Sequence, residues 1–79
     1  MKSNMKIGLL WFDDSRRPIG EKIGQAAERY RQKFGRWPNC VFVNPGTLGN
    51  FRSPNGLQVV AADNILPNHF WIGVAEQAG

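Results

Sequence analysis

The fold of this chain is decided by residues 6–44, which read KIGLLWFDDSRRPIGEKIGQAAERYRQKFGRWPNCVFVN. An apolar run at residues 7–12 comes first, an amphipathic helical pattern follows it, and a second apolar run begins at Cys40. A strand, a helix and a second strand joined by short connections are typical of a crossover between two parallel strands. Residues 7–12 are apolar at both alternating positions, which predicts a central strand covered on both faces.

The middle of this segment predicts a helix with one apolar face. At 100° per residue, five apolar side chains fall within a narrow arc; they are Ile19, Ile23, Ala26, Tyr30 and Phe34. The Asp-Asp-Ser side chains of residues 13–15 can accept hydrogen bonds from free amides, so the helix is expected to begin between Ser15 and Pro18. Gly35 suits the left-handed position after a helix end, which places that end near Phe34.

Two glycines, Gly20 and Gly24, lie one turn apart inside the predicted helix. Each costs about 1 kcal/mol relative to alanine in a helix interior. A close approach of the helix to its own sheet explains them, and a flat contact with a second subunit is the alternative.

The remainder of the chain predicts further strands. Cys40–Val43 forms the second strand, and residues 44–56 form a long loop that ends in a tight turn at residues 53–56. Residues 57–62 and 69–75 favour strands, and their spacing predicts an antiparallel hairpin. In the last strand Phe70 and Ile72 share the face expected to meet the helix. The sequence thus predicts one small α/β domain, α+β-like, covering residues 1–79 in the order β-α-β-β-β, with a mixed four-stranded sheet and one covering helix.

Composition and charge narrow the classes of function. The chain of 79 residues has a net charge of +4, and nine of its ten basic residues lie in residues 1–36. Its one cysteine, Cys40, excludes an internal disulfide and a multi-cysteine zinc site, and its place in an apolar run predicts a buried thiol. We expect a cytoplasmic protein with no membrane contact, because the sequence shows neither a signal peptide nor a membrane-spanning run.

The leading hypothesis is a non-catalytic binding module. One helix cannot cover both faces of a four-stranded sheet, so an apolar face is expected to stay open and to join a second copy in a homodimer, or to bind another protein. The predicted contact residues are two tryptophans and a loop pair: Trp11, Trp71, Phe51 and Arg52. The alternative is that the long loop folds back over this face.

Nucleic-acid binding is the second hypothesis. Basic residues on the solvent side of the helix are expected to form a stripe that follows a phosphate backbone, with two arginines added at the helix start. The residues are Arg16, Arg17, Lys22, Arg29, Lys33 and Arg36. A solvated helix face explains the same pattern without a ligand.

A magnesium-dependent phosphoryl-transfer enzyme that uses Asp13 and Asp14 is the third hypothesis, since carboxylates at the carboxyl end of a strand can hold Mg²⁺. Capping of the helix start is the simpler explanation of the pair. If the strand before Asp63 runs antiparallel to the first strand, Asp63 and His69 lie at the opposite edge of the sheet from Asp13, and no nucleophile with a base is found. The sequence therefore favours binding over catalysis and predicts no cofactor.

The short first strand, the acidic turn at Asp13 and the basic helix resemble the opening of ferredoxin-like nucleic-acid-processing domains. The resemblance covers less than half of the chain and implies a second helix between the third and fourth strands. Residues 63–68 are too few to form that helix, so the sequence assigns no family.

Overall fold

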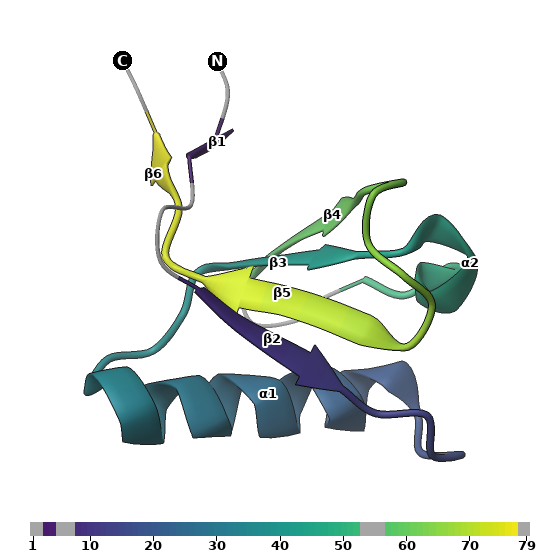
Figure 1. Cartoon of the computed structure of the whole chain (residues 1–79), viewed down its shortest axis with the longest axis horizontal. Helices are drawn as coiled ribbons and strands as arrows, with labels where there is room; N and C mark the ends of the chain where they lie inside the picture. Colours follow the sequence, from purple (N-terminus) through teal and green to yellow (C-terminus); the bar gives the residue numbers. More distant parts are fainter. Residues whose placement is uncertain (1–2, 5–7, 53–56, 78–79) are drawn as a thin grey trace.

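The computed structural model describes residues 3–4, 8–52 and 57–77 (Figure 1). Its elements are β1 (Ser3–Asn4), β2 (Gly8–Phe12), α1 (Ile19–Phe34), β3 (Cys40–Val43), α2 (Pro45–Leu48), β4 (Gln58–Ala61), β5 (His69–Gly73) and β6 (Glu76–Gln77). The predicted fold class is confirmed, because α1 packs on a mixed four-stranded sheet. The short helix α2 and a small antiparallel pair of β1 and β6 were not predicted. The predicted turn at residues 53–56 lies outside the described residues.

The strand order in the sheet is β2-β5-β3-β4 (Figure 1). Strand β5 is antiparallel to both β2 and β3, so these two strands are parallel to each other but are not neighbours. Strand β4 pairs in parallel with β3. Two predictions are therefore wrong: β2 is an edge strand, and β4 and β5 form no hairpin because β3 lies between them.

The apolar run of β2 has a different cause from the one expected. Leu9 and Trp11 pack against the core on the helix side. Leu10 and Phe12 alternate with them and are 57% and 55% exposed. The strand is thus apolar on both faces, and its second face belongs to the side of the sheet opposite α1, which we call the open face.

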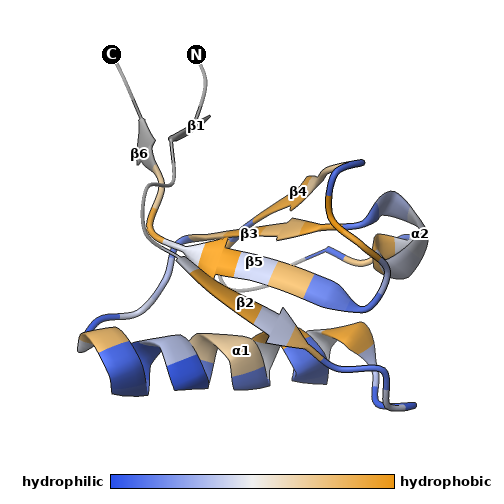
Figure 2. Cartoon of the chain, viewed as in Figure 1, coloured by the Kyte–Doolittle hydropathy of each residue, from blue (hydrophilic) through white to orange (hydrophobic). Residues whose placement is uncertain are grey.

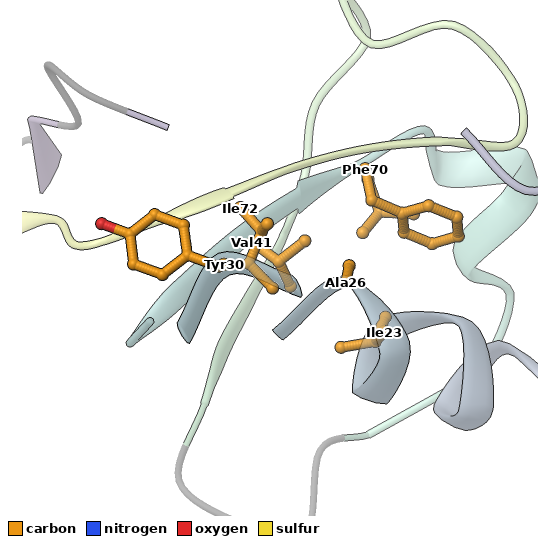
Figure 3. Close-up of a cluster of buried hydrophobic side chains, with 7 residues drawn as sticks. Ile23, Ala26, Tyr30, Val41, Phe70 and Ile72 are labelled. Carbon is orange, nitrogen blue, oxygen red and sulfur yellow. The ribbon is translucent and has the colours of Figure 1, made fainter. Parts of the chain in front are cut away.

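The core lies between α1 and the other face of the sheet (Figure 3). Its buried members are Ile23, Ala26, Tyr30, Val41, Val43, Phe70 and Ile72. The prediction that Phe70 and Ile72 meet the helix is confirmed, since both are fully buried. Burial of each large side chain here contributes roughly 1.5–3 kcal/mol, which makes this layer the main source of stability.

Helix α1 ends where the sequence predicts and begins later than expected. Gly35 follows the helix with φ 78°, and its N–H donates to the carbonyl of Arg31 at 2.8 Å. The first helical residue is Ile19, and Pro18 before it offers no side-chain cap. The predicted cap is wrong because Asp13 Oδ1 accepts the N–H of Ser15 at 2.8 Å, in a turn that precedes the helix.

The last turn of α1 projects beyond the sheet. Sixteen residues span about 24 Å at ~1.5 Å each, whereas a five-residue strand spans about 17 Å at ~3.4 Å each. Phe34 belongs to the predicted apolar arc but is 37% exposed, and its ring centroid lies 4.5 Å from that of Tyr30. The end of the helix therefore leaves an aromatic side chain in solvent.

Residues 44–52, the described part of the connection from β3 to β4, bring two side chains to the helix side of the sheet. Leu48 and Phe51 pack against the core there, and the Phe51 ring lies 3.2 Å from the point where a Cβ on Gly20 would be. The close approach of Phe51 in the loop, rather than of the sheet, thus explains why a glycine stands at position 20. A Cβ on Gly24 would meet nothing within 4 Å, so its position is not explained by a contact of this kind. Leu48 and Phe51 therefore do not cover the open face.

Candidate interaction face

The open face carries one apolar row that crosses all four strands. Leu10 of β2 is paired with Trp71, which is paired with Phe42 of β3, and Phe42 is paired with Val60 of β4. Directly paired residues point to the same side of a sheet, so these four side chains are neighbours. Leu10 is exposed and the other three are partly buried. We call this set, Leu10, Trp71, Phe42 and Val60, the apolar row.

The rings of Phe12 and His69 extend the apolar row toward one end of the sheet. Phe12 and His69 are register partners, and their ring centroids lie 4.8 Å apart at an interplanar angle of 45°. The strands read GLLWF, CVFV, QVVA and HFWIG, so none of them contains Asp, Glu, Lys or Arg. Figure 2 shows these strands mainly in orange, while the side of α1 turned away from them is blue.

The position of Trp71 depends on a glycine in the neighbouring strand. A Cβ on Gly8 would lie 2.8 Å and 2.9 Å from two atoms of the Trp71 indole and 3.1 Å from the carbonyl oxygen of Ile72. The ring thus extends from β5 over the backbone of β2. Gly8 provides the space that lets the largest side chain of the open face lie close to the backbone of β2.

Only one of the four predicted contact residues lies on the open face. Trp71 lies there, but Trp11 is paired with Phe70 and faces the helix, so its assignment as an anchor of this face is corrected. Phe51 packs against the core, and Arg52 is exposed in the loop. The residues that sequence reasoning missed are Leu10, Phe12, Phe42 and Val60. These residues can be identified only once the strand register is known, and the register cannot be determined from the sequence alone.

Trp11 also has an unusual hydrogen-bond state. Its indole Nε1–H is buried and has no acceptor within the described part of the chain. A buried donor without a partner costs about 1–3 kcal/mol. Trp11 therefore contributes to the fold through its apolar area alone.

The six basic residues predicted to bind nucleic acid do not form one surface. Arg16 and Arg17 are exposed before the start of α1, and the group Arg29, Lys33 and Arg36 is exposed around its other end, about 24 Å away for a helix of sixteen residues. Lys22 was expected on the solvent side but is only 7% exposed. Lys22 lies in the first turns of α1, whereas only the last turn of the helix projects beyond the sheet.

The prediction that separated Asp63 and His69 from Asp13 is wrong. Because β4 runs parallel to β3, Asp63 follows the same edge of the sheet as Asp13, and the N–H of Asp13 donates to the carbonyl of Asn68 at 3.0 Å. Within residues 3–4, 8–52 and 57–77, however, no group of three or more His, Cys, Asp or Glu side chains is placed to hold a metal ion. The shared edge adds no support for a magnesium enzyme.

The amide and hydroxyl side chains at this edge serve the fold. Asn44 accepts the N–H of Gly46 at 2.8 Å and donates to the carbonyl of Ile65 at 2.8 Å. Thr47 Oγ1 accepts the N–H of Asn68 at 3.0 Å. These side chains tie α2 to the loop before β5 instead of presenting ligands.

The charge state of Asp13 is set by its turn. Hydrogen bonds from the Ser15 hydroxyl and backbone N–H hold the pKa of the Asp13 carboxyl below its usual range, and the charges of Lys22 and Arg17 lower this pKa further. A depressed pKa stabilises the folded state above about pH 3.9, and this stabilisation is lost as the pH falls through the lowered pKa. The carboxylate is thus engaged in local structure.

Replacing Ser15 by alanine is expected to raise the pKa of Asp13 toward its usual value, because the hydroxyl donor is lost while the backbone N–H stays. The carboxyl carbon of Asp13, followed by NMR from about pH 6 to pH 2, reports the shift. The Asp13→Asn variant identifies the signal. An identical titration midpoint in the native protein and the Ser15→Ala variant would contradict the assigned hydrogen bond.

The predicted burial of Cys40 is confirmed, since its side chain is fully buried. Burial raises the pKa of the Cys40 thiol, which keeps it protonated and unreactive at neutral pH.

Comparisons with protein-family models, curated proteins and solved structures find no match to this chain. Of the helices in the described part of the chain, neither has the length and apolar character needed to cross a membrane. The interpretation of the open face rests on its own geometry.

Proposed function

We propose that this protein is a non-catalytic interaction module that self-associates through the open face of its sheet. The apolar row carries the proposal, with Leu10 and Phe12 beside Trp71 more than half exposed. Apolar patches of a few hundred Å² on the surface of a folded chain are often sites of protein contact.

The size of the open face supports a reversible dimer. Four strands about 4.8 Å apart and about five residues long give each copy a flat area of roughly 300 Å². Two copies would cover roughly 600 Å², which is below the ~1,200–2,000 Å² of stable complexes. We therefore expect a dimer that forms and dissociates with protein concentration.

The distribution of charge supports a second copy as the occupant. Each chain carries +4, so two chains repel if their basic residues meet. The strands carry no such residues, and α1 lies on the other side of the sheet. In a face-to-face dimer the two helices would lie roughly 30 Å apart, about three Debye lengths at 0.1 M salt. Two open faces can therefore meet without bringing the basic residues of the two α1 helices together.

Leu10→Lys tests the proposal, because it places a charge in the apolar row without removing a core side chain. Sedimentation equilibrium should show the native mass rising with concentration toward twice that of the monomer, and a constant monomer mass for the variant. Leu66→Lys is the matched control, because Leu66 is 66% exposed in the loop before β5. This variant should dimerise as the native protein does.

Self-association would be refuted if the native protein stayed monomeric up to about 1 mM. A dissociation constant of that size corresponds to a free energy of association of only about 4.1 kcal/mol. Equal loss of the dimer in both lysine variants would show that added charge, rather than the open face, controls it.

A further inference from the structure

We infer that the carboxyl-terminal end of α1 binds single-stranded nucleic acid. The site consists of four cations and two exposed rings distributed around the end of the helix, which we call the basic–aromatic end: Arg29, Arg31, Lys33, Phe34, Arg36 and Trp37. It lies on the other side of the sheet from the apolar row, so it goes beyond the proposed self-association and does not depend on it.

The net charge of this end equals the net charge of the whole chain. Residues 29–37 contain four cations and no acid, a charge of +4 that equals the net charge of the protein. No Asp or Glu occurs from Arg29 to Ala62. The helix dipole explains basic residues in the last turn, namely Arg31 and Lys33, but Arg36 follows the helix and gains nothing from it.

Two aromatic side chains lie among these cations in solvent. Trp37 is 56% exposed and Phe34 is 37% exposed. The guanidinium carbon of Arg31 lies 5.1 Å from the centroid of the Trp37 ring, and Lys33 Nζ lies 5.6 Å from that of Phe34. Because the last turn of α1 extends past the strands, the sheet does not cover these rings.

Cations beside exposed rings match the chemistry of an unpaired nucleic acid strand. Its phosphates pair with Lys and Arg, and its bases offer flat faces that stack on aromatic side chains. A duplex hides those base faces, and an acidic peptide has charge without them. The combination favours a single strand over these other polyanions.

The test measures binding of a fluorescent oligothymidylate of about twenty nucleotides by anisotropy over a range of salt concentrations. Trp37→Ala should weaken binding about tenfold at every salt concentration, because a stacked base is lost. Arg31→Ala/Arg36→Ala should lower the slope of log K against log salt by about 1.4, since each phosphate contact on a single strand contributes ~0.7. The second variant decides the question if the tryptophan variant fails to fold.

Arg16→Ala/Arg17→Ala is the matched control, because it removes the same charge at the opposite end of α1. It should keep the native slope, and the native slope should also persist in the monomeric Leu10→Lys protein. An equal decrease of the salt slope in both double-arginine variants would overturn the site, because it would show that only the net charge of the protein controls binding. Tighter binding to a duplex of the same length, or binding to phosphatidylserine vesicles without binding to the oligonucleotide, would overturn the choice of ligand.

Discussion

Phe70→Ala is expected to remove a large share of the free energy of unfolding of this protein. Phe70 is fully buried in the core between α1 and the sheet. A buried Phe→Ala change costs about 3–5 kcal/mol through lost burial and the cavity that forms. A domain of 79 residues has a total stability of roughly 4–12 kcal/mol at ~0.05–0.15 kcal/mol per residue. Urea unfolding followed by circular dichroism measures the loss.

Phe12→Ala is the matched control, because the same side chain is removed from the open face. Phe12 is 55% exposed, so its loss should change the free energy of unfolding by about 0.5 kcal/mol or less. Both variants are measured at low protein concentration, where the monomer predominates. Similar destabilisation by the two changes would contradict the assignment of the two faces of the sheet.

Gly8→Ala is expected to have the second largest effect on stability. The new methyl group would lie within 2.9 Å of the Trp71 indole and close to a backbone carbonyl, so the ring must move. Overpacking of this kind costs about 1–3 kcal/mol. The free energy of unfolding should fall, and the side-chain NMR signals of Trp71 should shift because the ring leaves the surface of β2.

Gly24→Ala makes the same substitution where the structure leaves space. Nothing lies within 4 Å of its new Cβ, and Gly24 is exposed inside α1. The variant should therefore be more stable than the native protein by up to about 1 kcal/mol. Stabilisation by both alanines would show that Trp71 does not depend on the gap at Gly8.

The helix could be predicted from the sequence because its signals are local. The apolar arc from Ile19 to Phe34 and the left-handed Gly35 place the end of α1 where the structure has it. The burial of Lys22 could not be predicted in the same way. It depends on where α1 crosses the sheet, since Lys33 at a similar angle around the helix is exposed beyond the strands.

Strand pairing could not be predicted because it depends on partners far apart in the sequence. The pattern of β5 correctly assigned Phe70 and Ile72 to the core, but nothing nearby shows that β5 lies between β2 and β3. The facing of one predicted contact residue was wrong for the same reason. Trp71 was correctly placed on the open face, while Trp11 was assigned to the wrong face because the register of β2 was unknown.

The inner position of β5 has a consequence for how the protein acquires its structure. β5 follows the other three strands of the sheet along the chain, yet β2 and β3 are joined only through it. While the ribosome is still making residues 69–73, β2 has no partner and only β3 and β4 can pair. The nascent chain therefore cannot complete this sheet until residues 69–73 have been made, and closing it should occur in one step that is governed by long-range pairing.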